Sequence, residues 1–365
     1  MSNLSKITKV LSFLGLLGSL PLLAEPFNQF QVIGSHNSYK QVMPISALTY
    51  VMSHDPKLAK AIDYSHPPLN EQLKLGIRHF EIDLLLDPTS GMYAHPKLEE
   101  ILEQTVLNTS ERELLKQSGL KVLHIPDVDV KSHCNLFKQC LTQLLSWSEA
   151  HPNHFPFIIL INVKESSVGF IKGQQPFTFH SKDYAQIDNE IRQVVPKEKL
   201  FTPDKLRGNY STLEKAVLTQ GWPELAELRG KFLFLFDGNP RQNSLYAAEH
   251  ASLRGRAMFA SFAPGQAESA FLIINDPIKK FAEIHSAVKQ GYMVRTRSDA
   301  NLSATNLQRA SRKEAAFNSG AQVISSDFYQ GSTQAQEAGY SVVFNTNHFI
   351  RPNPIFHVFS SRLNN

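Results

Sequence analysis

Short apolar runs that end in polar or charged residues recur along the whole chain, and stretches with helical spacing separate them. Several runs are continuous rather than alternating, which is typical of strands buried on both faces of a parallel sheet. Apolar residues recur at helical intervals in 136–150 and 304–317. The runs are 30–33, 80–86, 92–93, 122–125, 157–163, 232–236, 258–262, 292–294 and 323–324.

A strand followed by a helix, repeated about eight times, predicts an α/β fold of the (β/α)8 TIM-barrel type. A doubly wound open sheet is the alternative, but no glycine-rich dinucleotide-binding turn follows the first run. We expect one domain over 25–365, with long inserted loops at 40–70, 96–120 and 166–200.

The composition indicates an ordinary globular protein, because 42% of the 365 residues are hydrophobic and 19% are charged. The formal net charge is +4, with 37 basic and 33 acidic residues interspersed. This mild and mixed charge gives no indication of nucleic-acid binding. We expect no nucleic-acid partner, and a monomer.

The first residues have the pattern of a secretory signal peptide over 1–24. Lys6 and Lys9 form a basic start, 10–23 is largely apolar, and Ala24 is a small residue at a plausible cleavage point. The apolar run is shorter than the roughly 20 residues that span a bilayer. An uncleaved anchor or a buried helix is the alternative. We therefore expect an exported protein, secreted or periplasmic, without a transmembrane segment.

The chain has two cysteines, Cys134 and Cys140, close together in sequence. In an oxidising compartment such a pair is typical of a short-loop disulfide. The alternative is two buried free thiols. Two cysteines alone cannot hold a structural zinc ion.

Polar residues cluster where the predicted strands end, which in a barrel is the active-site face. His36 and Asn37 follow the first strand. Glu81 and Asp83 are two apart in the second, so they share one face, which we interpret as the barrel interior. Two inward carboxylates require compensation, and oxygen-only ligands favour calcium or magnesium. The alternative is pairing with basic side chains such as Lys164 or Arg295.

A second histidine, His95, follows 92–94. Two imidazoles around a metal ion suit a phosphodiester, since one can accept a proton from the attacking oxygen while the other donates one to the leaving oxygen. Lys164, Arg295 and Arg297 follow strands and are candidates to bind phosphate, with structural ion pairs as the alternative. The pattern around Asp327 indicates only a turn or helix cap.

Taken together, these segments resemble the calcium-dependent phosphatidylinositol-specific phospholipase C family, within the PLC-like phosphodiesterase TIM-barrel superfamily. The resemblance extends in order over nearly all of the chain after residue 24. The matching segments are GSHNSY (34–39), RHFEIDLLLD (78–87), MYAHP (92–96), KVLHIPDVDVKSHC (121–134), 140–165, 221–238, VRTRSD (294–299) and AAFNSGAQVISSDFYQ (315–330).

The resemblance implies cleavage of phosphatidylinositol-like lipids at a membrane surface to diacylglycerol and a cyclic inositol phosphate. It implies that His36 and His95 are the catalytic pair, with Glu81 sharing the role of base. It also implies that Ca²⁺ is held by Asn37, Glu81 and Asp83. Glycerophosphodiester hydrolysis on the same barrel, or non-catalytic binding of a lipid or inositol phosphate, are the alternatives.

One position departs from the family pattern. Two residues before Lys164 the family usually has a carboxylate, and here that residue is Asn162. An amide oxygen can still bind Ca²⁺, but the site would hold two carboxylates instead of three, which lowers affinity. The nearby Glu165 has the opposite strand parity and should face elsewhere.

Overall fold

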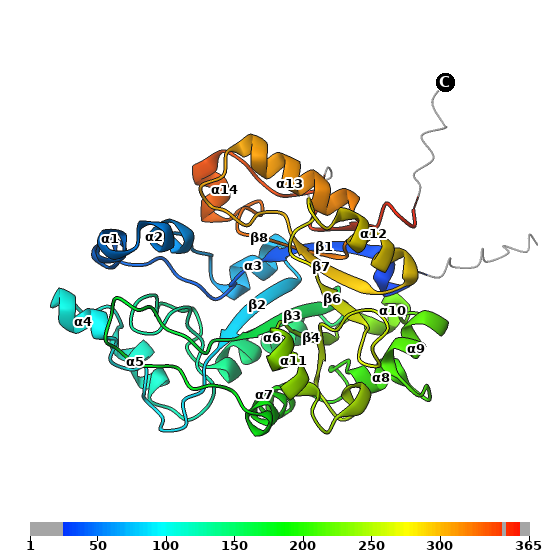
Figure 1. The fold of residues 1–365 in the computed structure, drawn as a ribbon, viewed down its shortest axis with the longest axis horizontal. Helices are drawn as coiled ribbons and strands as arrows, with labels where there is room; N and C mark the ends of the chain where they lie inside the picture. Colours follow the sequence, from blue (N-terminus) through cyan, green and yellow to red (C-terminus); the bar gives the residue numbers. More distant parts are fainter. Residues whose placement is uncertain (1–24, 345–347, 358–365) are drawn as a thin grey trace, which may run out of the picture.

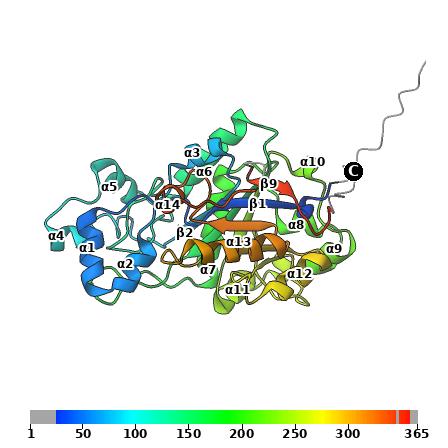
Figure 2. The same cartoon turned by 90° about the horizontal axis from the view of Figure 1, so that it is seen from above.

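The computed structural model describes residues 25–344 and 348–357, so the predicted signal peptide lies outside the described residues. Eight parallel strands follow one another in chain order, with helices around them (Figures 1 and 2). The predicted α/β class is confirmed. The strands are β1 (Phe30–Ser35), β2 (His79–Leu84), β3 (Phe157–Val163), β4 (Phe232–Phe236), β5 (Met258–Ala260), β6 (Phe271–Ile273), β7 (Met293–Arg297), β8 (Val323–Ser326) and a ninth, β9 (Ile350–Pro352).

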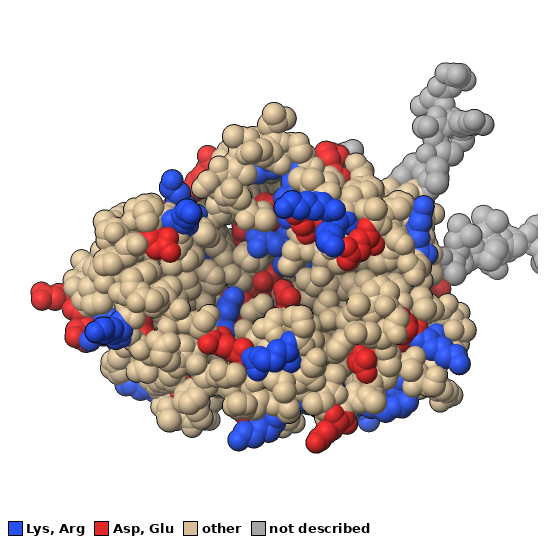
Figure 3. All heavy atoms as spheres, in the orientation of Figure 1, with Lys and Arg blue, Asp and Glu red and all other residues tan. Residues whose placement is uncertain are grey.

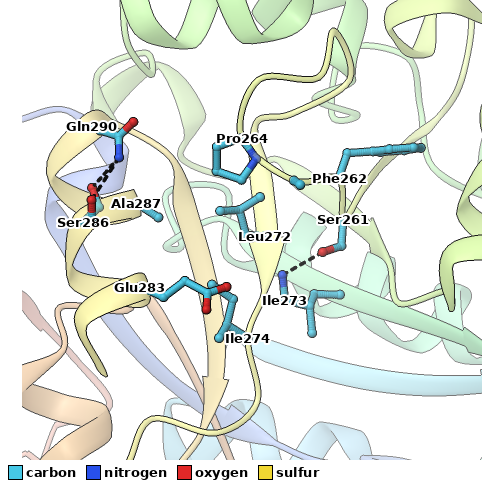
Figure 4. A pocket seen from close by; sticks show the side chains of 11 residues that line it. Ser261, Phe262, Pro264, Leu272, Ile273, Ile274, Glu283, Ser286, Ala287 and Gln290 are labelled. Atoms are coloured by element: carbon cyan, nitrogen blue, oxygen red, sulfur yellow. Dashed lines mark hydrogen bonds between the residues drawn. The ribbon is translucent and has the colours of Figure 1, made fainter. Parts of the chain in front are cut away.

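The strands form two hydrogen-bonded arcs, in the orders β2-β3-β4-β5 and β6-β7-β8-β1-β9. At the seam between β5 and β6, the Ile273 N–H donates to Ser261 Oγ at 2.9 Å, and a cavity of about 300 Å³ opens beside this bond (Figure 4). At the seam between β1 and β2, the Ser38 N–H donates to the Glu81 carbonyl at 2.9 Å. A Cβ at Gly34 would lie 2.4 Å from the His79 carbonyl oxygen, so this seam requires glycine.

Several helices begin at recognisable capping residues. Asp55 caps α2 directly before Pro56, and Thr305 forms a capping box with Gln308 at the start of α13. The α-helices are α1 (Ile45–His54), α2 (Pro56–Ile62), α3 (Leu69–Leu75), α4 (Lys97–Leu102), α5 (Thr109–Leu115), α6 (Phe137–Ala150), α7 (Ser181–Val194), α8 (Pro203–Arg207), α9 (Leu213–Thr219), α10 (Leu225–Leu228), α11 (Pro240–Ala247), α12 (Phe281–Gln290), α13 (Asn306–Asn318) and α14 (Thr333–Ala338). Helices α6 and α13 confirm the two amphipathic stretches.

A lobe beside the barrel carries α1, α2, α4 and α5, and it lies at the left in both views (Figures 1 and 2). It has a small apolar core of its own, separate from the barrel core. Its buried residues come from three inserted loops that are distant in sequence: Met43, Ala47, Val51, Ala59, Ile62, Leu98, Val128 and Ile171. The inserted loops therefore form a packed structure at one side of the barrel.

Two predicted strands are wrong, and two strands, β6 and β9, are missed. Residues 92–93 lie in a turn and pack in a third apolar cluster, while 122–125 makes only isolated bridges. Strands β6 and β9 are each only three residues long. The predicted disulfide between Cys134 and Cys140 is present. Among the described residues, the helices are all too short or too polar to cross a bilayer.

Candidate active site

Side chains from five strands meet at the carboxyl ends of β1, β2, β3, β7 and β8, where a barrel forms its active site. Figure 3 shows a hollow in this face beside the lobe, with acidic and basic side chains inside it. The contacts described below join the predicted residues from these strands: His36, Asn37, Glu81, Asp83, Asn162, Lys164, Arg295 and Arg297.

His36 follows β1 and is bound on both ring nitrogens. Its Nδ1 lies 3.0 Å from Asp327 Oδ1, and its Nε2 lies 3.2 Å from an Arg297 guanidinium nitrogen. Because a guanidinium can only donate, this contact requires a lone pair on Nε2, and Nδ1 then carries the proton that is donated to Asp327. The His36 Nε2 is thus prepared to accept a proton.

Asp327 directly follows β8. The sequence indicates only a cap at this position, but in the structure its carboxylate contacts three side chains of the site. Besides His36, it lies 3.2 Å from Arg297 and 3.5 Å from His66 Nε2. Burial alone would raise the pKa of the Asp327 carboxyl, but the hydrogen bond from His36 and the positive charge of Arg297 outweigh it and hold the pKa well below its usual value. The anion fixes the orientation of the His36 ring.

Glu81 and Arg295 form a buried ion pair, with an N–O distance of 2.5 Å. Burial opposes ionisation of Glu81, but His36, Arg295 and Arg297 outweigh it, so its pKa lies below the usual value. Its second oxygen, Oε1, lies 3.7 Å from His36 Nε2. Arg295 is therefore an ion-pair partner of a site carboxylate, as the alternative to a metal ion predicts. Arg297 instead contacts His36.

Asp83 is fully buried and is compensated in the same way. Its Oδ2 accepts from the Tyr39 hydroxyl at 2.7 Å and lies 3.0 Å from Lys164 Nζ. Its other oxygen, Oδ1, has no hydrogen-bond partner among the described residues. A buried carboxylate oxygen without a partner costs free energy unless a ligand satisfies it.

Asn37 has a left-handed backbone with a φ of 45°, a conformation that asparagine tolerates. Its Nδ2 donates to the Tyr64 hydroxyl at 2.6 Å, which fixes the orientation of the side-chain amide. The Oδ1 is buried and has no partner within the described part of the chain. Tyr64 also stacks against His36, with ring centroids 5.7 Å apart.

Asn162 stands opposite Asp83 in the pairing of β2 with β3. Its Nδ2 donates to the Asp237 carbonyl at 3.2 Å. Burial raises the pKa of the neighbouring Asp237 side chain to about 6. Glu165 points elsewhere, as its parity predicted, because it bonds Arg241 at 2.5 Å.

The second predicted histidine lies in different surroundings. His95 is exposed, and its Nδ1 lies 3.2 Å from Arg112, which also pairs with Glu99. By contrast, His124 lies 6.2 Å from Tyr64, ring to ring, and 2.8 Å from Asp129. Tyr64 therefore has His36 and His124 as neighbours. No local feature of the segment KVLHIPDVDVKSHC (121–134) reveals this contact of His124.

The donor atoms of the site fit a hard cation. Asn37 Oδ1 and Asp83 Oδ1 are buried acceptors without protein partners among the described residues, and Glu81 Oε1 lies 3.7 Å from His36 Nε2. All are oxygens, the atoms that Ca²⁺ prefers. The fit comes from these amide and carboxylate oxygens together, since no cluster of three or more His, Cys, Asp and Glu in the described ranges is arranged for a metal.

The fold and the site define an α/β-barrel enzyme in which a histidine, arginines and paired carboxylates meet at the strand ends. This is an arrangement suited to phosphate esters. A family model described as "Phosphoinositide phospholipase C, Ca2+-dependent" matches residues 26–354. The chain belongs to this family and is a phosphodiesterase of the phosphatidylinositol-specific phospholipase C type.

Solved structures support the fold. A calcium-dependent phosphoinositol-specific phospholipase C from Pseudomonas sp. is 17% identical, with a TM-score of 0.51 over 90% of this chain and 96% of that one. A Ca²⁺-dependent phosphatidylinositol-specific phospholipase C from Streptomyces antibioticus is also 17% identical, with a TM-score of 0.54 over 83% of this chain and 95% of that one. A search of curated proteins finds no match.

Proposed function

We propose that this chain cleaves phosphatidylinositol-like lipids into diacylglycerol and a cyclic inositol phosphate. The observation that carries the proposal is His36, held by Asp327 at Nδ1 with its Nε2 lone pair beside Arg297. Nε2 takes the proton of the inositol 2-hydroxyl while that oxygen forms a bond to phosphorus. The bond between phosphorus and the diacylglycerol oxygen breaks, and a second imidazole gives this oxygen a proton.

Two histidines are candidates for the proton donor. The sequence predicts His95, whereas the geometry favours His124, because His124 shares Tyr64 as a neighbour with His36. His95→Ala and His124→Ala form a matched pair of variants. The one that loses about 10²–10⁴-fold in rate on phosphatidylinositol, with an unchanged melting temperature, identifies the donor.

Arg297 is placed to bind a phosphoryl oxygen, since it is partly exposed and touches His36. Lys164 and Arg295 hold Asp83 and Glu81 in place and have a smaller share in binding the substrate. We assign Ca²⁺ to Asn37, Glu81, Asp83 and Asn162. When bound, the ion would neutralise charge on the phosphoryl group.

Calcium titration tests this metal assignment. Asn162→Glu adds a third carboxylate and should lower the half-saturating calcium concentration, measured both by activity and by thermal shift. Asn162→Gln, which keeps an amide, is the control. Full activity of the wild type in excess chelator would instead assign the compensating charge to Lys164 and remove the calcium site.

The activity itself is tested on phosphatidylinositol vesicles, with ³¹P NMR of the water-soluble product. A cyclic phosphate signal supports the proposal. Cleavage of glycerophosphoinositol to glycerol phosphate would indicate the glycerophosphodiester alternative, and binding without turnover would indicate a lipid-binding protein.

We also propose that the chain is exported, which the disulfide between Cys134 and Cys140 supports. Mass spectrometry of the exported protein should find an N-terminus near Glu25. A retained segment 1–24 would remove the signal-peptide assignment.

A further inference from the structure

Both histidines beside Tyr64 are held by a buried carboxylate at Nδ1. His36 Nδ1 lies 3.0 Å from Asp327 Oδ1, and His124 Nδ1 lies 2.8 Å from Asp129 Oδ2. Both aspartates are buried, and both imidazoles have the Tyr64 ring as a neighbour. The two imidazoles therefore have the same kind of support, although they come from distant parts of the chain.

A tight turn places Asp129 beside His124. The N–H groups of His124 and Ile125 donate to the Asp129 carbonyl at 3.2 and 3.1 Å, and the Asp129 N–H donates to the Ile125 carbonyl at 2.9 Å. The other carboxylate of this turn, Asp127, accepts instead from backbone N–H groups outside it. The backbone thus fixes Asp129 as the carboxylate that contacts the imidazole.

A buried lysine binds the same oxygen of Asp129. Lys40 Nζ lies 3.0 Å from Asp129 Oδ2 and donates to the Tyr64 carbonyl at 2.8 Å. The second carboxylate oxygen, Oδ1, is buried and has no hydrogen-bond partner in the described part of the chain. Burial opposes ionisation of Asp129, but the charge of Lys40 and the hydrogen bond from His124 outweigh it, so the pKa of this carboxyl lies below its usual value.

Lys40 and His124 thus share one acceptor atom of a carboxylate anion. Because both nitrogens contact this atom, the charge of Lys40 opposes a second positive charge on the imidazole. Asp129, Lys40 and Tyr64 are the ionisable side chains in contact with this ring or its carboxylate within the described ranges. The carboxylate therefore favours a protonated ring, and the lysine limits that preference.

The reactive nitrogens of the two histidines have different surroundings. The Arg297 guanidinium lies 3.2 Å from His36 Nε2 and requires a lone pair there. His124 Nε2 makes no hydrogen bond to a described residue, and the side chain is partly exposed. A proton on His124 Nε2 is therefore accessible to a leaving oxygen, whereas His36 is arranged to accept one.

We propose that Asp129 and Lys40 are positioning residues for His124 as the proton donor. Asp129 orients the ring and stabilises its protonated form, and Lys40 weakens this hold so that Nε2 can release its proton to the diacylglycerol oxygen as the bond to phosphorus breaks. This inference rests on the proposed function and deepens it. A carboxylate without the lysine would hold the proton more firmly and make a weaker acid.

The test is the pH dependence of kcat on phosphatidylinositol vesicles. A proton donor must be protonated, so the rate falls above an alkaline limit. Asp129→Asn removes the anion, and we expect the limit to move down by about one pH unit and the rate at neutral pH to fall about 10–100-fold. Lys40→Met removes the competing cation and should move the limit up by about one pH unit. A merely structural pair would not give opposite shifts.

Two further variants separate this effect from lost stability. Each single variant leaves a buried charge without its partner, whereas Lys40→Met/Asp129→Asn removes both charges and should keep the fold with a lowered alkaline limit. Asp188→Asn breaks the buried pair with Arg256 at the other end of the barrel and should leave the limit unchanged. The inference is wrong if both single variants move the limit in the same direction, or if the folded double variant leaves it in place.

The two proposals fail separately. If His124→Ala keeps the wild-type rate, the inference is overturned and proton acceptance by His36 stands. Absence of all lipid cleavage overturns the proposed function. NMR titration of the His124 ring without lipid then still tests the pair, because the ring should take up its proton at lower pH in Asp129→Asn and at higher pH in Lys40→Met.

Discussion

Two buried charged networks, one at each end of the barrel, are built differently. At the amino ends of the strands, Asp188 accepts from the Tyr246 hydroxyl at 2.9 Å, from the Ala257 N–H at 3.0 Å and from Arg256 at 3.0 Å. Arg256 also donates to the Tyr246 carbonyl at 2.7 Å. Both carboxylate oxygens of Asp188 thus have protein partners.

The network at the carboxyl ends is incomplete by comparison. Asp83 and Asn37 each keep a buried oxygen without a partner among the described residues, although Lys164 and Tyr64 bind their other polar atoms. A closed network of buried charges stabilises one conformation, whereas an open one retains capacity for a ligand. Both networks are buried and charged, so these properties do not distinguish them. The buried oxygens without hydrogen-bond partners do distinguish the network at the carboxyl ends.

The largest expected effect is on activity at the open network. His36→Ala should lower the rate on phosphatidylinositol by about 10²–10⁴-fold, because it removes the proton acceptor, with little change in melting temperature. His54→Ala, an exposed histidine on α1, is the control and should keep full activity. Near-normal turnover of His36→Ala would show that the base is wrongly assigned.

The closed network should respond in stability instead. Arg256→Met leaves Asp188 as a buried charge without its ion-pair partner, so we expect a loss of about 3–5 kcal/mol in the free energy of unfolding. Denaturant titration measures the loss, and activity per folded molecule should persist. A stability loss below about 1 kcal/mol would contradict the structural role given to this pair.

A pH-dependent effect is expected near the same end of the barrel. Burial lowers the pKa of His154 to about 4, below the unfolded value near 6.5. The unfolded chain therefore binds more protons between these values, and stability falls by up to roughly 3 kcal/mol as pH drops from 6.5 to 4. His154→Gln should flatten this slope, and the exposed neighbour His151→Gln should not.

The smallest expected effect is at Asn37. Asn37→Gly keeps the left-handed backbone available and removes the unpartnered oxygen, so we expect the stability without calcium to change by no more than about 1 kcal/mol. The thermal stabilisation by calcium should decrease. An unchanged calcium shift would exclude this oxygen from the metal site.

Strand parity accounts for the part of the site that the sequence predicts. Glu81 and Asp83 point inward as their spacing indicates, and Glu165 points away. Local spacing carries no such information for Asp327, which meets His36 across the β1–β8 pairing, 291 residues away.

The error at 92–93 has a physical reason. The apolar side chains of Met92 and Tyr93 pack in a cluster with Leu85, Leu107 and Leu123, outside the barrel sheets. The sequence alone does not separate such a cluster from a short buried strand. The expected position of His95 at a strand end depended on that interpretation.

The pairing of β1 has a consequence for how the protein is made. Val32 pairs with Val323 on one side and with Ile350 on the other, so the strands that form ladders with β1 come only from the last part of the chain. During synthesis, the strand that precedes His36 must wait for these segments, while β2 to β5 can already associate. Such distant contacts fold slowly, and the catalytic centre is therefore expected to be among the last parts to assemble.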